Sequence, residues 1–147
     1  MLVVPDAVGT GEISVPHDSA SVREARSRVQ DDLARRGVDD DVVDVSVLVL
    51  SEMVSNALKH ARPLPDGKVR VSWALEDGRL ALQVTDGGGV TRPRLQQQSA
   101  TSAGGRGLGV VRRLSADWGV REQGPETTVW AVIDLDARTV RRSSDRS

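Results

Sequence analysis

The chain has 147 residues, and its 20 Lys and Arg against 21 Asp and Glu give a formal net charge of −1 at pH 7. This balance provides no strongly basic surface, so we expect no direct contact with nucleic acid or with an acidic membrane. The chain has no cysteine, which excludes disulfides, Cys-ligated metals and thiol catalysis. The apolar start, Met1–Asp6, is too short for a signal peptide, and no run approaches the roughly 18 apolar residues of a membrane span. We therefore expect a cytoplasmic protein.

The first part of the chain predicts one strand and two helices. Residues 12–16 alternate briefly like an edge strand that a proline ends. Apolar residues then recur at helical spacing up to Gly37. Three residues can cap this first helix: Asp18, Ser19 and Ser21. A second helix is predicted over about 39–61, because the segment opens on three aspartates and its middle is apolar almost all round, which indicates a buried helix.

The second part of the chain predicts a sheet, a long loop and one more helix. Four segments have strand character: 68–75, 79–85, 118–122 and 127–134. The first two flank an Asp-Gly turn, which is typical of a hairpin. Residues 86–105 are rich in Gly, Gln, Ser and Thr, as functional lids often are, and a helix is predicted over about 107–116. We expect residues 1–136 to form a single domain and the Arg- and Ser-rich tail 137–147 to be mobile.

A polar stripe marks the second predicted helix. Glu52, Asn56 and His60 are four residues apart and therefore share one face, while Val, Leu and Met occupy the other faces. The alternative is an ordinary solvated face, which any surface helix has. His60 either faces a ligand or caps the helix end, and His17 is expected at the surface.

An acidic residue at a predicted strand end, Asp86, is followed by three glycines at 87–89. A carboxylate there can accept a hydrogen bond from an exocyclic amine, and glycines allow the backbone to lie against a flat ring. The alternative is an ordinary turn, because Asp-Gly is a common turn dipeptide. However, three consecutive glycines carry an entropic cost that a simple turn does not need.

A second glycine-rich segment, residues 104–109, opens the last predicted helix. Helix N-terminal amides and the close approach that glycine permits are suited to phosphates. The segment is not a Walker loop, because Gly-x-x-x-x-Gly-Lys-Ser/Thr is missing, and it is not a dinucleotide-binding fingerprint, because it follows a loop rather than a strand. The alternative is a flexible linker, and the abrupt apolar helix that follows counts against it.

In their order along the chain, the three features resemble the N box and the two glycine boxes of the GHKL superfamily, the ATPases of gyrase, heat-shock chaperones, histidine kinases and mismatch repair. Residues 52–61 match the N box, and residues 105–109 match the second glycine box. Asp86 and Gly88 match the first glycine box, whereas Val90 stands where its second glycine is expected. The resemblance implies the Bergerat fold, an α+β two-layer sandwich with a mixed, mainly antiparallel sheet and helices on one face.

This resemblance covers about residues 12–135 and implies a site for Mg-ATP. Asn56 would give its amide oxygen to Mg²⁺, a cation that prefers oxygen ligands. Glu52, one helical turn away, would act as general base on a serine hydroxyl or water. Asp86 would bind the adenine amino group, with Gly88 giving access to the ring.

The resemblance also implies roles for the later residues. Thr127 would assist adenine binding through water, in a Gly-Thr pair whose glycine is replaced here by Glu126, and Thr128 is a neighbour that could serve. The second glycine box would hold the phosphates with residues Gly104, Gly105, Arg106, Gly107, Leu108 and Gly109. Arg106 would touch the γ-phosphate or the protein partner, or be an exposed arginine of the lid.

Within that superfamily, the short chain is similar to the bacterial anti-sigma-factor serine kinases and their single-domain relatives. The resemblance implies a serine/threonine-protein kinase that transfers the ATP γ-phosphate to a serine of an antagonist protein and sequesters a sigma factor, and it allows a homodimer. Two alternatives stay open: a nucleotide-gated protein-binding module without kinase activity, and a histidine-kinase-type catalytic domain. The second of these normally follows a pair of dimerisation helices, and only about 40 residues precede the second predicted helix.

Overall fold

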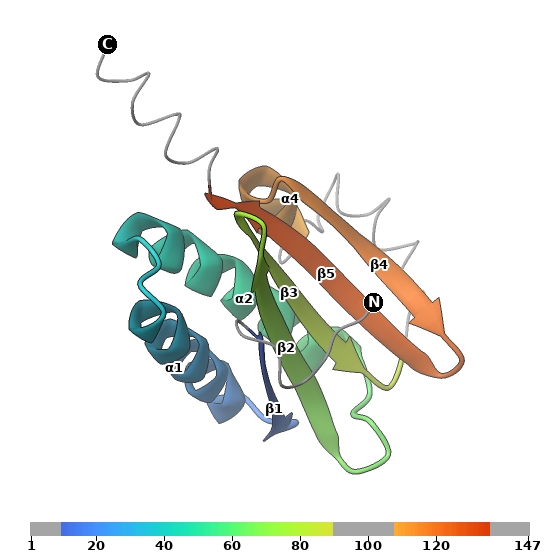
Figure 1. Ribbon diagram of the computed structural model, residues 1–147. Coiled ribbons are helices and arrows are strands. Elements are labelled where there is room, and N and C mark those ends of the chain that lie inside the picture. Colours follow the sequence, from blue (N-terminus) through green and yellow to red (C-terminus); the bar gives the residue numbers. More distant parts are fainter. Residues whose placement is uncertain (1–9, 90–107, 136–147) are drawn as a thin grey trace.

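The computed structural model describes residues 10–89 and 108–135 (Figure 1). The strands are β1 (Thr10–Pro16), β2 (Lys68–Glu76), β3 (Arg79–Asp86), β4 (Asp117–Gln123) and β5 (Glu126–Asp134). The helices are α1 (Ala20–Arg35), α2 (Asp40–His60) and α4 (Leu108–Leu114). Every predicted strand and helix is present in the described ranges, and the ends differ by one or two residues. Most of the predicted lid and the tail 137–147 lie outside the described residues.

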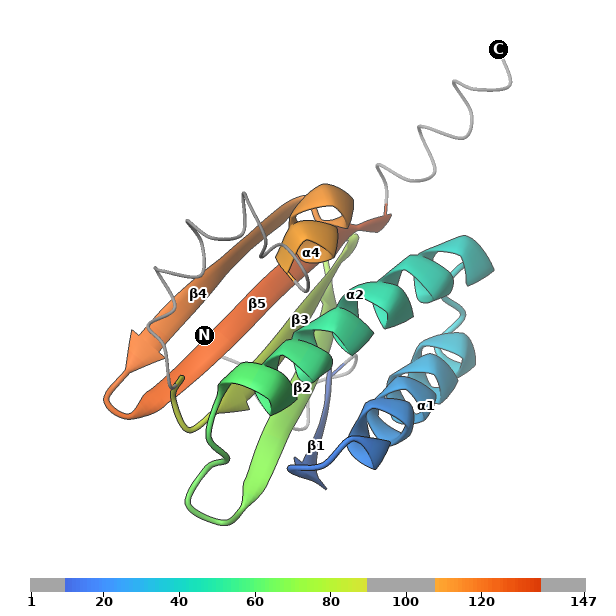
Figure 2. The same ribbon diagram turned by 180° about the vertical axis from the view of Figure 1, so that it is seen from behind.

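The five strands form one sheet in the order β1-β2-β3-β5-β4. All four strand pairings are antiparallel. The helices lie together on one face of this sheet, as two opposite views show (Figures 1 and 2). The predicted two-layer α+β sandwich is therefore confirmed. Among the described helices, none is long and apolar enough to cross a membrane.

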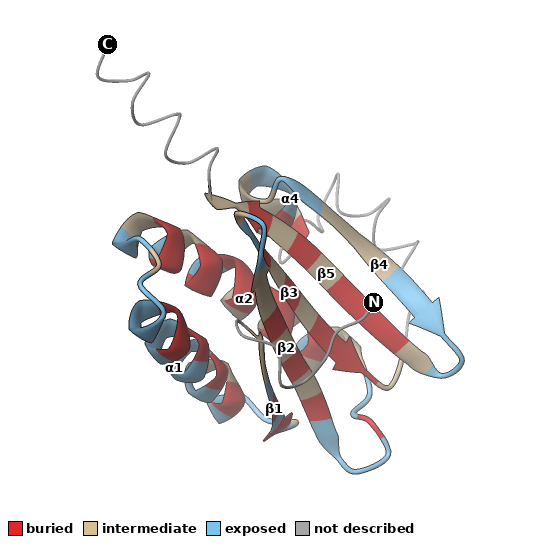
Figure 3. Ribbon diagram, in the orientation of Figure 1, coloured by how far each residue is buried: buried red, intermediate tan, exposed pale blue. Residues whose placement is uncertain are grey.

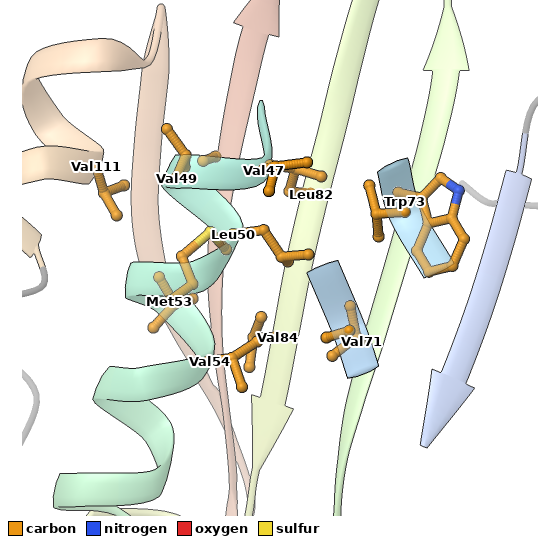
Figure 4. Packing of buried hydrophobic residues seen from close by; sticks show 14 of the residues in the cluster. Val47, Val49, Leu50, Met53, Val54, Val71, Trp73, Leu82, Val84 and Val111 are labelled. Atoms are coloured by element: carbon orange, nitrogen blue, oxygen red, sulfur yellow. The ribbon is translucent and has the colours of Figure 1, made fainter. Parts of the chain in front are cut away.

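The core fills the space between the sheet and the helices. Along β2, β3 and β5 buried and less buried residues alternate, so one face of each strand is turned to the helices (Figure 3). Leu50 and Val54 of α2 pack over this face, close to Leu82 and Val84 of β3 (Figure 4). Each such aliphatic side chain contributes about 1.5–3 kcal/mol when it is fully buried. The prediction that the second helix is buried is confirmed, and its burial fixes which of its faces is left for the polar stripe.

Carboxylates begin both long helices. Asp18 accepts a hydrogen bond from the amide of Ala20 at 3.0 Å, whereas Ser19, at the N-cap position of α1, makes no side-chain cap. Asp39 caps α2 by accepting from the amide of Asp41 at 2.9 Å. These contacts satisfy amides that the first helical turn leaves unpaired.

A buried carboxylate fastens α1 to the sheet. Asp32 accepts hydrogen bonds from Arg35, from Arg36 and from the indole nitrogen of Trp73, each at 2.8 Å. Burial opposes its ionisation, but the hydrogen bonds from Arg36, Trp73 and Arg35 outweigh that effect and hold the pKa of Asp32 below its ordinary value. The indole lies against Gly11 of β1, where any larger side chain would collide with the ring. This end of the molecule is thus closed by a charged group whose partners are all provided by the protein.

Candidate functional site

The polar stripe of α2 is split between two hollows of the surface. Glu52, Asn56 and His60 are all half-buried. Asn56 and His60 line a small pocket between the end of α2 and the sheet. Glu52 instead lines a groove between α1 and α2. Successive members of the stripe are about 6 Å apart along the helix axis, since a helix rises 1.5 Å per residue. The stripe therefore connects the two hollows.

The small pocket brings together segments that are far apart in the sequence. It is lined by Asn56, His60, Ala61, Asp86, Gly89, Val120, Thr127 and Val129. Asp86 is the last residue of β3 and Thr127 is the second residue of β5, and the two are directly opposite each other in the β3–β5 pairing. Both are buried, with exposed fractions of 4% and 7%. Two polar side chains thus point under the helix layer, at the position where the carboxamide of Asn56 lies.

The pairing also separates Thr127 from its neighbours. Thr128 is on the opposite face of the sheet, where its hydroxyl is bonded to that of Thr85 at 2.7 Å. Glu126 also lies on that opposite face and is paired with Arg70 at 3.3 Å. Because side chains alternate along a strand, Glu126 does not compete with Thr127 for the pocket. Of the two threonines that the sequence left open, Thr127 is the one in the pocket.

Asp86 is the pocket residue with the most perturbed electrostatics. Burial raises its pKa to about 6, while a hydrogen bond from the amide of Gly88 at 2.8 Å and the nearby charge of His17 act in the opposite direction. Burial disfavours the charged form of a carboxyl group, so the ionised Asp86 is stabilised by any further donor that reaches it. The residue is therefore suited to a ligand that presents an N–H group.

The glycines after Asp86 have a requirement of their own. Any side chain at Gly87 would collide with the carbonyl of Pro63. Gly88 has a φ of +101°, and a Cβ there would lie 2.8 Å from the carbonyl oxygen of Pro125. The backbone of Arg62 is bonded to both glycines, accepting from Gly87 at 2.8 Å and donating to the carbonyl of Gly88 at 2.9 Å. The neighbouring backbone comes so close that positions 87 and 88 require glycine whether or not a ligand binds. The sequence did not reveal this requirement.

His17 was expected at the surface, and the structure leaves it exposed only in part. His17 is half-buried, and its Nε2 lies 3.0 Å from the carbonyl oxygen of Ala61. Ala61 in turn forms a β-bridge with Gly89. His17 therefore holds the junction between α2 and the glycine turn, close enough to Asp86 for its charge to act on that carboxyl group. The contact joins residues 44 positions apart, so no local pattern could have indicated it.

The second glycine box is described only in part. Gly104, Gly105, Arg106 and Gly107 lie outside the described residues, as does Val90 of the first box. Leu108 begins α4 and is buried in the core, with 5% of its surface exposed. A Cβ added to Gly109 would meet nothing within 4 Å in the described part of the chain. Unlike Gly87, Gly109 has room for a side chain, so packing in the described ranges does not explain this glycine.

The residues present fit a hard cation that a nucleotide helps to bind. Asn56 offers a carboxamide oxygen at the pocket, and Glu52 offers a carboxylate one turn away. Residues 10–89 and 108–135 contain no group of three His, Asp or Glu that could hold a metal alone. Mg²⁺ commonly takes one or two protein oxygens and completes its shell with phosphates and waters.

Comparison with known proteins gives a family and two similar folds. The sequence profile of the histidine kinase-like ATPase domain matches residues 15–133. No curated protein matches this sequence significantly. The crystal structure of the RsbU and RsbW domains of Rv1364c from Mycobacterium tuberculosis is similar with a TM-score of 0.67 and 22% identity over 86% of this chain. The match spans only 32% of the length of that Mycobacterium chain.

A chain in the crystal structure of the SiaB-SiaC complex from Pseudomonas aeruginosa is also similar. Its TM-score is 0.61 at 15% identity, over 84% of this chain and 88% of the other. At these identities the two structures show a common fold.

Proposed function

This chain belongs to the histidine kinase-like ATPase domain family, and we propose that it is an ATP-dependent protein serine kinase of the anti-sigma-factor type. The observation that carries the proposal is the convergence of Asn56, Asp86 and Thr127 on one pocket, beside the helix that carries Glu52. In this proposal the substrate is a serine of a partner antagonist protein, and ATP supplies the phosphoryl group.

The adenine ring would lie against the pocket, on the side that the sheet forms. Asp86 would accept a hydrogen bond from the adenine amino group, because a buried carboxylate gains most from an added N–H donor. Thr127, opposite Asp86, would bind the ring through water. Gly88 would lie beside the ring. His17 would hold the Ala61 backbone, and with it this end of the pocket, in position.

The phosphates would extend from the pocket towards the start of α4. Asn56 would give its carboxamide oxygen to Mg²⁺, which supplies charge neutralisation on the phosphate oxygens when it is bound. The backbone amides of the second glycine box, Gly105, Gly107, Leu108 and Gly109, would bind the phosphate oxygens, with Gly104 allowing the approach. The room around Gly109 supports a close approach by a ligand at this point. Arg106 would contact the γ-phosphate or the partner.

Glu52 would act on the acceptor. Its carboxylate would take the proton of the serine hydroxyl while the hydroxyl oxygen forms a bond to the γ-phosphorus. The bond between that phosphorus and the β–γ bridging oxygen breaks, and ADP leaves with the bridging oxygen. General-base assistance of this kind contributes roughly 10²–10⁴-fold to a rate. Positioning and electrostatic stabilisation supply most of the rest in phosphoryl transfer.

The partner in this proposal is a protein, an antagonist protein or a sigma factor. The similar fold in Pseudomonas comes from a complex of two proteins, SiaB and SiaC, and the similar fold in Mycobacterium comes from a chain with RsbU and RsbW domains. A second candidate function is a nucleotide-gated module that holds its partner without transferring phosphate. The position of Glu52 outside the nucleotide pocket is compatible with either function.

A single substitution separates the two functions. Glu52→Gln keeps the size of the side chain and removes the base, so the kinase predicts Mg-ATP affinity within about tenfold of wild type and phosphoryl transfer lower by roughly 10²–10⁴-fold. Single-turnover transfer from γ-labelled ATP to candidate antagonist proteins measures this effect. Glu24→Gln, at an exposed position of α1, is the matched control and should leave both quantities unchanged.

Undiminished transfer by Glu52→Gln would remove Glu52 from the chemistry. No transfer by wild type, with nucleotide-dependent capture of the partner retained by both proteins, would establish the module instead.

A further inference from the structure

A groove of about 330 Å³ lies between α1 and α2, which are in contact and lie side by side (Figure 2). It is lined by Arg26, Gln30, Asp44, Val47, Leu48, Ser51 and Glu52. Asp44, Leu48 and Glu52 follow one another at intervals of one helical turn. The groove therefore follows two turns of α2, about 12 Å, and it ends at the residue proposed as the base.

The middle of this groove is apolar. Leu48 is 47% exposed, and it is the one large hydrophobic side chain that is exposed within residues 10–89 and 108–135. Val47 beside it is buried in the core. The hydroxyl of Ser51 donates to the carbonyl of Val47 at 2.7 Å, so this polar group is already satisfied. A partner side chain that covers Leu48 would bury apolar surface without leaving that hydroxyl unpaired.

The two ends of the groove differ in chemistry. Asp44 is an exposed carboxylate at one end, and Glu52 is a half-buried carboxylate at the other. Arg26 adds a positive charge on the α1 side, so the three charged groups of the lining sum to one negative charge. An occupant that carries a cation next to Asp44 complements this end.

Continuity with the nucleotide pocket identifies the occupant. Glu52 lines the groove, and Asn56, one turn further along α2, lines the pocket. We propose that the groove binds the acceptor segment of the partner protein, with its serine at Glu52, an apolar side chain on Leu48 and a basic side chain at Asp44. This inference rests on the proposed function and adds to it the chemistry of the substrate.

The spacing of Asp44, Leu48 and Glu52 along α2 sets the spacing of the complementary residues in the substrate. The serine and the apolar residue lie about 6 Å apart, and the serine and the basic residue about 12 Å apart. An extended peptide rises about 3.3 Å per residue, so these residues are two and four positions from the serine. An extended segment also leaves the hydroxyl available, whereas serine in a helix tends to bond the carbonyl four residues before it. The acceptor segment is therefore an extended five-residue unit with the serine at one end.

Peptides test the proposal with two independent readouts. The probes are Ser-Ala-Leu-Ala-Arg and Arg-Ala-Leu-Ala-Ser, capped and fluorescently labelled, with variants that carry Glu for Arg or Ala for Leu. Binding is measured by anisotropy on the full chain with Mg-ADP, and transfer is measured with γ-labelled ATP. We expect Leu48→Asp to weaken binding of the Leu peptide at least tenfold. Asp44→Lys should reverse the preference between the Arg and Glu peptides.

The controls keep the outcomes distinct. Asp31→Lys reverses an exposed charge of α1 that is not part of the groove lining, and it should leave peptide binding within twofold of wild type. Thermal unfolding confirms that each variant is folded, and a second variant, Leu48→Ala, tests the apolar contact without adding a charge.

Peptide binding that follows Leu48 and Asp44 without phosphate transfer by wild type would support the groove and overturn the kinase. Transfer that both substitutions leave unchanged would support the kinase and overturn the groove. Failure of every peptide to bind at 1 mM would also overturn the groove. Sedimentation of wild type and Leu48→Asp covers the remaining occupant. A dimer that Leu48→Asp dissociates would show that the groove holds a second copy of the chain, and it would overturn the proposal.

Discussion

Two buried carboxylates at different ends of the molecule have pKa values shifted in opposite directions. Asp32 has three donors from the protein, and its pKa lies below the ordinary value. Asp86 has the amide of Gly88, and burial raises its pKa to about 6. Both side chains are almost fully buried. Asp32 therefore serves the fold, because the protein itself provides its donors. Asp86 remains able to accept further hydrogen bonds from a ligand.

The largest effect on stability is expected at Asp32. Asp32→Asn removes the negative charge beside Arg35 and Arg36, and it turns the NH₂ group of the new side chain towards groups that are themselves donors. The free energy of unfolding should therefore fall by about 3 kcal/mol. Chemical denaturation at pH 7 measures the loss. Mg-ATP affinity of the folded variant should stay within twofold, since neither Asp32 nor its partners line the pocket. A loss of affinity without a loss of stability would reverse the roles of the two carboxylates.

The pH dependence of this effect follows from the lowered pKa of Asp32. A folded-state pKa below the unfolded value contributes stability that is present above the unfolded pKa and is lost as pH falls through the folded one. The difference between wild type and Asp32→Asn should therefore be constant above about pH 5 and shrink below about pH 4. Denaturation curves between pH 2.5 and 7 check this, and a difference that grows in acid would contradict it.

Asp86→Asn should change stability in the opposite direction. A folded-state pKa of about 6 lies above the unfolded value, so the ionised group costs stability once the pH exceeds about 4, and the cost is complete above about pH 6. The free energy of unfolding of the variant should exceed that of wild type by about 1–2 kcal/mol at pH 7, and the difference should disappear near pH 4. Thermal unfolding at both pH values measures it. A variant that is destabilised at pH 7 would show that Asp86 serves the fold as Asp32 does.

The smallest effect on stability is expected at a glycine. Because Gly109 has room for a Cβ, Gly109→Ala should raise the free energy of unfolding by up to about 1 kcal/mol through helix propensity. The same methyl group should lower Mg-ATP affinity at least tenfold, if a phosphate approaches the backbone there as proposed. Calorimetric titration and denaturation of the same sample separate the two quantities. Unchanged affinity would show that no ligand comes close to this residue.

Local patterns were sufficient to predict the elements of the fold. The alternation in β2 and β3 and the aspartates before α2 act within a few residues, and the structure has these elements within two residues of the predicted ends. The predicted placement of Asp86 at a strand end was likewise a local reading. Its partner Thr127 was named through a family resemblance, and the register that puts the two opposite each other is a property of the sheet.

Contacts between distant segments were not predictable in this way. His17 contacts the carbonyl of Ala61, and the carbonyl of Pro63 leaves no room for a side chain at Gly87. Both contacts arise because segments that are distant in the sequence pack together. Asp32 was missed for the same reason, because its indole donor comes from another element, 41 positions along the chain. The sequence shows which polar residues are present, whereas the packing decides which of them already have partners.

The preference for ATP over GTP is the sharpest test of the role proposed for Asp86. In the proposed site Asp86 accepts a hydrogen bond from the adenine amino group, and guanine presents a carbonyl oxygen at the equivalent position. Calorimetry should therefore show that wild type and Asp32→Asn prefer Mg-ATP at least tenfold, since a charge-assisted hydrogen bond is worth about 1.5–3 kcal/mol, and that Asp86→Asn loses this preference. An Asp86→Asn protein that keeps the full preference for ATP would contradict the account.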